Sequence, residues 1–198
     1  MLPTCQIYLS AKNTIHNMNH TIIGYEYTED SDEPHIGSDP TIRAGTIIYN
    51  DVAIGDHFST GHYALVRELT EIGDDVLVGT KAVIDGRTTV GSNVSLQTGV
   101  YVPSHTTIKD HVFLGPHAVL TNDPYPIRGD ADLAGPKIEE HASIGANATI
   151  LSDVTVGTKS FVAAGSVVVD DVPPETLAIG APAEHRSLPE EVPQRNKL

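Results

Sequence analysis

The sequence predicts an all-β fold, a parallel β-helix in which three six-residue repeats form each coil. An aliphatic residue recurs at every sixth position from Ile36 to Val168, except at Thr60, Pro126 and Asp132. A turn of the Gly-plus-acid type recurs at every eighteenth position. The chain of 198 residues has no Trp and is only 5% aromatic, which favours a core of small branched side chains. A helix repeats every 3.6 residues and a plain strand every two, so a period of six indicates a short strand followed by a tight turn.

The six-residue frame begins at Ile36 and runs unbroken to Val119. Its first position is Ile, Val or Leu in every hexad except the one that begins at Thr60. The fifth position is mostly Ala, Val or Thr, and Pro40 and Phe58 are the exceptions. We expect the large first residue to point inward, the small fifth residue to fit beside the corner, and the polar residues to face water.

A second, longer period sets the shape of the coil. The segments IGSD, IGDH, IGDD and VGSN begin at Ile36, Ile54, Ile72 and Val90, and IKDH follows at Ile108. Since the same turn returns every third hexad, three hexads make one coil and the cross-section is a triangle. Each face then stacks parallel strands about 4.8 Å apart.

The pattern divides the chain into five parts. We expect an N-terminal cap with an acidic loop over 1–35, coils over 36–119, an extruded loop over 120–137, further coils over 138–173, and a tail over 174–198. A polar loop of this size adds little to a core and is usually functional. The frame allows Leu120–Tyr125 to form one more hexad, and it equally allows the whole span to leave the rod. The tail is expected to form a short helix or to fray.

Composition excludes some classes of partner. The formal net charge of −14 argues against nucleic acid or an anionic membrane surface as the main partner. Cys5 is the one cysteine, so no internal disulfide can form and a reducing compartment is expected. No charged leader with an apolar stretch opens the sequence, and no apolar run approaches about 18 residues. We therefore expect a cytoplasmic protein with no membrane span.

The hexads and the ending VVVDDVPPETLAIGAPAEHR resemble the hexapeptide-repeat acyltransferases, whose fold is a left-handed parallel β-helix. The left-handed sense comes from this resemblance, not from the frame. The family's Gly-x-Pro-Ala turn is similar to Gly180–Ala183 here. Glu184 follows it where relatives often carry Lys, which weakens the expectation of a phosphate contact at that position.

One stretch, VSLQTGVYVPSHTTIKDHVFLGPHAVLTNDPYP, resembles the branch that N-acetylates amino groups of nucleotide-linked sugars. Its most specific element is Thr121-Asn122-Asp123 followed by Tyr125-Pro126. The resemblance implies an acetyl-CoA-dependent N-acetyltransferase whose products feed cell-surface glycans. It also implies a homotrimer, with acetyl-CoA and the sugar meeting in a groove between two subunits.

Acetyl transfer to an amine needs a group that accepts the amine's proton, a donor for the oxyanion, and a groove for the pantetheine arm. Histidine suits the first role near neutral pH. His117 directly precedes the loop, and His62 follows the one hexad start that is not aliphatic, so these two are the candidate bases. Asn122 and Asp123 are candidates to orient the substrate, or Asp123 to polarise a histidine, although Asn-Asp before Pro is also a common turn. We expect direct attack without an acyl-enzyme, since Cys5 lies in the cap.

The remaining site candidates divide between the two substrates. Gln97, Arg67 and Tyr125 are candidates to contact the sugar, with Arg87 and Arg128 as other cations for an acceptor carboxylate. Small residues in the later coils would let pantetheine lie against backbone amides, and cations would meet CoA phosphates. The candidates of this kind are Ala146, Ala163, Ala164, Gly165, Gly180, Pro182, Lys159 and Arg186. The alternative is that Ala and Gly serve only tight coiling.

Three other functions stay open at this stage. O-acetylation of a small sugar or of serine keeps the enzyme class and changes the acceptor. A gamma-type carbonic anhydrase shares the rod and binds zinc through three histidines, and His105, His111 and His117 are spaced by six. That spacing puts them on three successive faces, so no metal is expected within one chain. The last alternative is a non-catalytic scaffold.

Overall fold

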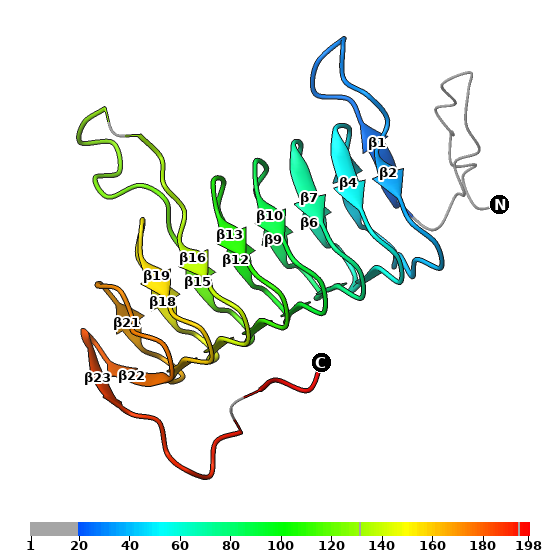
Figure 1. The fold of residues 1–198 in the computed structure, drawn as a ribbon. Helices are drawn as coiled ribbons and strands as arrows, with labels where there is room; N and C mark the ends of the chain where they lie inside the picture. The colour runs from blue at the N-terminus through cyan, green and yellow to red at the C-terminus, as the bar shows by residue number, and fades with distance from the viewer. Residues whose placement is uncertain (1–19, 131, 194) are drawn as a thin grey trace, which may run out of the picture.

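Three parallel sheets wind around one core in the computed structural model, which describes residues 20–130, 132–193 and 195–198. Figure 1 shows the coils stacked as a rod, from which a blue loop before residue 35 and a green loop after residue 120 project. The arrangement is the predicted left-handed parallel β-helix. No helix within the described residues has the length and apolarity needed to cross a bilayer.

The strands follow one another around the triangle, so each sheet collects every third strand. We call the three faces sheets A, B and C.

Sheet A contains, in order along the rod, β1 (Ile22–Tyr25), β3 (Ile47–Tyr49), β6 (Leu65–Val66), β9 (Val83–Ile84), β12 (Tyr101–Val102), β15 (Val119–Leu120), β18 (Thr149–Ile150) and β21 (Val167–Val168). Sheet B contains β2 (His35–Ile36), β4 (Val52–Ile54), β7 (Thr70–Ile72), β10 (Thr89–Val90), β13 (Thr107–Ile108), β16 (Lys137–Ile138) and β19 (Thr155–Val156). Sheet C contains β5 (Ser59–Thr60), β8 (Leu77–Val78), β11 (Ser95–Leu96), β14 (Phe113–Leu114), β17 (Ser143–Ile144), β20 (Phe161–Val162), β22 (Thr176–Gly180) and β23 (Ala183–Ser187). Neighbouring strands are parallel except β22 and β23, which form an antiparallel hairpin.

The first and fifth positions of the hexads build the core. Ile84, Leu114 and Ile144 are completely buried, as their first-position frame predicts. Two of the three exceptions in the pattern point inward: Phe58 and Thr60 are completely buried, whereas Pro40 is exposed. The Thr60 hydroxyl shares a hydrogen bond with the Thr46 hydroxyl, with 3.0 Å between the oxygens, so a polar group at a core position keeps a partner.

The corners share one backbone conformation. The fourth residue of a hexad has a positive φ, for example 57° at His57, 58° at His117 and 61° at His141. Asn, Asp, His and Gly tolerate this left-handed region better than most residues. The corner preference therefore explains why so many histidines recur at the fourth position.

The three corners of the triangle run along the rod as three edges. The C–A edge joins sheet C to sheet A and includes 61–63 and 115–117. The A–B edge includes 67–69 and 103–105, and the B–C edge includes 55–57 and 139–141.

The extruded loop lies on the A–B edge (Figure 1). Leu120 and Ile138 bound it, and both are completely buried in strands β15 and β16. The Thr121 amide still donates to the Ile150 carbonyl at 3.0 Å, and the Ala134 carbonyl accepts from the Asp153 amide at 2.9 Å. The hexad Leu120–Tyr125 does not form, since no described residue between 121 and 136 lies in a strand. The chain thus leaves the coil after 122 and rejoins it at 134.

The rod ends in different ways. Strand β1 and the acidic loop that follows it close the N-terminal end, and Cys5 lies outside the described residues. The β22–β23 hairpin closes the other end, and the tail then runs back along the rod (Figure 1). Asn196 Nδ2 donates to the His111 carbonyl at 2.9 Å and to the Ala142 carbonyl at 3.1 Å. The expected short helix or frayed tail is wrong for this segment, because Asn196 docks on the coils and the described tail contains no helix.

Candidate active site

The C–A edge brings together several of the residues that the sequence singled out. His62, Gln97, His117, Ala146 and Ala164 lie on it in this order along the rod. Corner hydrogen bonds connect successive coils of this edge: the His117 amide donates to the Thr98 carbonyl at 2.8 Å, and the Gly165 amide donates to the Ala146 carbonyl at 2.8 Å. The edge therefore joins a candidate base to a strip of small residues.

His117 lies over a glycine. A Cβ at Gly99, the same corner one coil earlier, would collide with the His117 imidazole at Nδ1 and Cε1. Gly99 has a φ of 71°, so it serves both the turn and the space for the ring. Gly99 was not among the predicted site residues, although a Gly at the fourth position one coil before a His indicates space for the imidazole. His117 is exposed on this platform and can meet a ligand.

His62 is exposed on the same edge but lies three coils from His117. The carbonyls of His62, Thr80 and Thr98 each accept a hydrogen bond from an amide of the following coil, so three coil-to-coil steps separate the two histidines. At about 4.8 Å a coil, the two corners are roughly 14 Å apart. One chain therefore cannot present both histidines to the same amine. Gln97 lies between them, and its Nε2 donates to the Ser95 hydroxyl at 2.7 Å.

Asn122 and Asp123 lie on the other side of sheet A from His117, because strand β15 separates the C–A edge from the A–B edge. Asn122 Nδ2 donates to the Ser104 hydroxyl at 3.0 Å, which anchors the start of the loop. Asp123 Oδ1 accepts from the Tyr125 amide at 2.8 Å, the turn that Asn-Asp before Pro can form. Tyr125 is 66% exposed and Ile127 is fully exposed with a φ of 63°.

Arg67 is held within its own chain. Its guanidinium forms two hydrogen bonds with Glu68, at 2.9 and 3.0 Å, and one with Asp85 at 2.7 Å. It also lies over the Tyr49 ring, 5.6 Å from the centroid. These contacts occupy the groups that would bind an acceptor carboxylate, so the geometry favours a structural role.

We expect Arg67→Met to destabilise the protein by about 1–3 kcal/mol, because it leaves the Glu68 carboxylate, 11% exposed, without its cation. Urea denaturation followed by circular dichroism measures the change. Arg87→Met, which removes an exposed cation one coil further along the same edge, is the matched control and should cost under 1 kcal/mol. Equal stability of the Arg67 variant and the parent would contradict the structural role.

The small residues of the later coils make the C–A edge flat. A Cβ at Gly145 would collide with the Ala164 backbone, so neighbouring coils approach closely here. Gly165 has a φ of 71°, and a Cβ there would meet no atom within 4 Å, so the space beside it is open. Ala163 and Ala146 are half-buried and Ala164 is exposed. The small residues of this edge therefore let neighbouring coils pack closely, and they also leave a strip of backbone open to a ligand.

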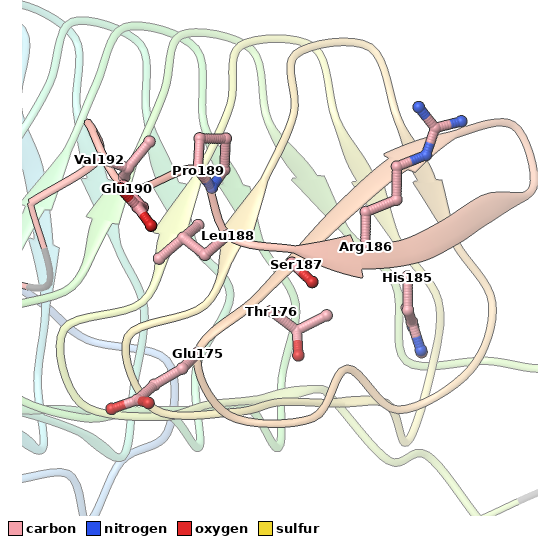
Figure 2. Close-up of a pocket in the computed structure, with 9 residues that line it drawn as sticks. All are labelled: Glu175, Thr176, His185, Arg186, Ser187, Leu188, Pro189, Glu190 and Val192. Carbon is pink, nitrogen blue, oxygen red and sulfur yellow. The ribbon is translucent and has the colours of Figure 1, made fainter.

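The other cofactor candidates lie elsewhere. Lys159 is on the B–C edge, where its ammonium lies 3.3 Å from Glu175. Gly180 and Pro182 form the turn of the β22–β23 hairpin. A cavity of about 570 Å³ lies beside this hairpin, and Figure 2 shows the residues that line it. His185 and Arg186 line it but point to opposite sides of strand β23, and Arg186 lies 3.5 Å from Glu184.

The zinc alternative finds no support in its three histidines. His105 lies on the A–B edge, His111 on the B–C edge and His117 on the C–A edge. A single chain cannot bring three different edges of a packed rod to one ion.

Comparison with known proteins gives the family. The family described as "Bacterial transferase hexapeptide (six repeats)" matches residues 135–170, and "Hexapeptide repeat of succinyl-transferase" matches residues 70–104. The chain belongs to the hexapeptide-repeat proteins. The two matched segments lie on the two sides of the loop, so the loop interrupts one continuous array.

Individual relatives cover only part of the chain. A Schizosaccharomyces pombe protein named for acetyltransferase activity is 37% identical over 81 residues, 38% of this chain and 39% of its own length. Serine acetyltransferase of Escherichia coli is 41% identical over 81 residues, 36% of this chain and 29% of its own. This hexapeptide-repeat chain thus spans well under half of these relatives.

A solved structure shows the same fold. LpxA from Bacteroides fragilis, a UDP-N-acetylglucosamine acyltransferase, superposes with a TM-score of 0.61 at 21% identity, covering 81% of this chain and 72% of its own. At this identity the likeness supports the β-helix fold and carries nothing about the substrate.

Proposed function

We propose that this protein is an acetyl-CoA-dependent N-acetyltransferase that acts on the amino group of a nucleotide-linked amino sugar in the cytoplasm. The observation that carries the proposal is the C–A edge. It presents an exposed imidazole at His117 and, on the coils that follow, an open strip of backbone at Ala146, Ala164 and Gly165. A base beside an open strip of backbone that can receive the pantetheine arm is what transfer from a thioester requires. The acetyltransferase names of the curated relatives support the same class.

The residues divide the reaction between them. The His117 imidazole accepts the proton that the acceptor amine loses as its nitrogen attacks the thioester carbonyl. The amides of Ala146 and Ala164, which donate no hydrogen bond within the described residues, are available to stabilise the oxyanion. The C–S bond then breaks, the leaving CoA thiolate takes the proton back from the His117 imidazolium, and no residue of this chain carries the acetyl group between the two substrates.

The second part of the proposal is a homotrimer with sites between subunits. Sheet A presents a row of apolar side chains outward, whereas the outward row of sheet B is largely polar. From β3 to β15 the sheet A row is Ile47, Leu65, Val83, Tyr101 and Val119, before Thr149, and from β4 to β16 the sheet B row is Ala53, Glu71, Thr89, Thr107 and Lys137. Apolar surface of this extent favours association. Burial of sheet A against a second copy brings the C–A edge of one subunit to the A–B edge and loop of another.

The loop itself supports such an arrangement. Ile127, a β-branched residue, is fully exposed and has a φ of 63°, an uncommon conformation for this type of side chain. A site between subunits gives the apolar tip a surface to cover. It also lets Asn122 and Asp123 act beside the His117 of a neighbouring subunit.

A charge on sheet A tests the assembly. We expect Val83→Lys to shift the protein from trimer to monomer in sedimentation velocity, because three buried ammonium groups would have to be desolvated at the interfaces. Acetylation should fall together with the trimer. Thr89→Lys, on the outward row of sheet B, is the control and should leave the mass unchanged. A trimeric Val83→Lys variant would place the interface elsewhere.

Release of free thiol from acetyl-CoA tests the activity, with a panel of UDP- and dTDP-linked amino sugars and with serine as acceptors. Turnover with one amino sugar supports the proposal and names the acceptor. Turnover with serine alone would move the reaction to O-acetylation, which the serine acetyltransferase likeness favours as the second candidate. No thiol release with any acceptor would overturn the assignment.

A further inference from the structure

A second group of chemistry-bearing residues lies on the B–C edge, away from the candidate active site. His111 and His141 occupy the same corner on neighbouring coils, and their rings stack with centroids 4.6 Å apart and an interplanar angle of 8°. Glu140 lies beside them, and one donor atom from each of the three residues lies within 4.8 Å of the others. Two imidazoles and a carboxylate form a donor set that zinc-class ions favour.

The distances suit an ion better than a hydrogen bond. Glu140 Oε1 and His141 Nε2 are 3.6 Å apart, beyond the range of a good hydrogen bond. Two ligands about 2.1 Å from a tetrahedral zinc ion are roughly 3.4 Å apart. The stacked His111 ring needs only a rotation about its soft terminal torsion to turn a nitrogen toward the same point.

His141 has a nitrogen that the fold does not satisfy. Its side chain is only 12% exposed, and its Nδ1 is buried without a hydrogen-bond partner among the residues that the structure describes. A buried polar atom of this kind needs a partner. A rotation of the His141 ring, or a water molecule held by a bound ion, would give this nitrogen a hydrogen-bond partner.

The donor types select the type of ion. The cluster offers two imidazole nitrogens and a single carboxylate. Mg²⁺ and Ca²⁺ prefer several oxygen ligands, so this set disfavours them and suits a zinc-class ion.

We propose that His111, Glu140 and His141 bind one divalent transition-metal ion of the zinc class. His111 precedes the loop in the sequence and His141 follows it, so the ion would join the two coils between which the chain is interrupted. Asn196 bonds the carbonyls of both histidines, at 2.9 and 3.3 Å, so the tail covers the same point. The ion has a structural role, because strand β14 or β17 separates this edge from the C–A edge on each coil.

Isothermal titration of the chelator-stripped full chain with Zn²⁺, and separately with Mg²⁺, tests the site. We expect one Zn²⁺ per chain at micromolar or tighter Kd, a rise in Tm of about 5 °C or more at saturating Zn²⁺, and no response to Mg²⁺. His111→Asn and His141→Asn should each weaken Zn²⁺ binding at least tenfold. Asn tolerates the positive φ of both corners, so these variants keep the backbone conformation.

His57→Asn is the matched control. His57 has the same corner position on the same edge, with a φ of 57°, but lies beside Asp75 instead of a second histidine. Its loss should leave the titration unchanged. The proposal is overturned if the parent protein binds no Zn²⁺, or if all three variants bind it as the parent does. A titration weakened equally by His57→Asn would show diffuse surface binding and would overturn it as well.

Discussion

The His117→Asn variant is expected to keep its fold and to lose at least about 100-fold in kcat in the thiol-release assay. His117 is the exposed imidazole that borders the open backbone strip, and Gly99 beneath it provides the space in which the ring lies. Asn is the appropriate replacement, because the corner has a φ of 58° and Asn adopts that conformation readily. Circular dichroism and the Tm check that the rod is intact, and initial rates at saturating substrates give kcat.

Two further variants make the result specific. His57→Asn changes the same corner position on the B–C edge and should retain full activity. His62→Asn changes the C–A edge itself, three coils away, and should reduce kcat far less than His117→Asn. A loss of 100-fold in His62→Asn with near-normal turnover in His117→Asn would move the base to His62 and the groove toward the N-terminal coils. Near-normal turnover in both would leave proton removal to Asp123 or to water.

The hexad frame predicted the rod because one inward residue every six positions leaves a single geometry for the backbone. Two of its three exceptions also followed the frame, since Thr60 and Phe58 are completely buried, whereas Pro40 in the first hexad is exposed. The period is a local property of the chain, repeated many times, so no long-range information was needed. The reason for the corner histidines was not predicted, since a positive φ is invisible until the turn is built.

The site was less predictable, because its residues belong to different edges of the triangle. His117 and Asn122 are five positions apart in sequence, yet strand β15 puts them on opposite sides of sheet A. Arg67 was expected to contact the sugar, but Glu68 and Asp85 occupy its guanidinium. The docking of Asn196 on the coils around residues 111 and 142 joins segments too far apart for any local pattern to indicate.

Deleting residues 122–133 is expected to abolish activity while preserving the rod. Leu120 and Ile138 are eighteen positions apart, where other first-position residues on successive strands are six apart. Removal of these twelve residues joins Thr121 to Ala134 and creates the hexad LTAGPK. This hexad has Gly at the fourth position, where the corners need a positive φ, and Pro at the fifth, as at Pro40. We therefore expect a Tm within about 5 °C of the parent, since no core side chain is lost.

The same deletion removes Asn122, Asp123 and Tyr125, so kcat/KM should fall at least about 100-fold if the loop completes a site on the neighbouring subunit.

A full-length variant with Asn122→Ala and Asp123→Ala separates the two polar residues from the rest of the loop. If it loses as much activity as the deletion, these side chains act on the substrate; a smaller loss assigns the remainder to the apolar tip around Ile127. A stable, fully active deletion would remove the loop from the site altogether. An unfolded deletion with an intact double variant would show that residues 122–133 belong to the folding unit, contrary to the frame that places them outside the coil.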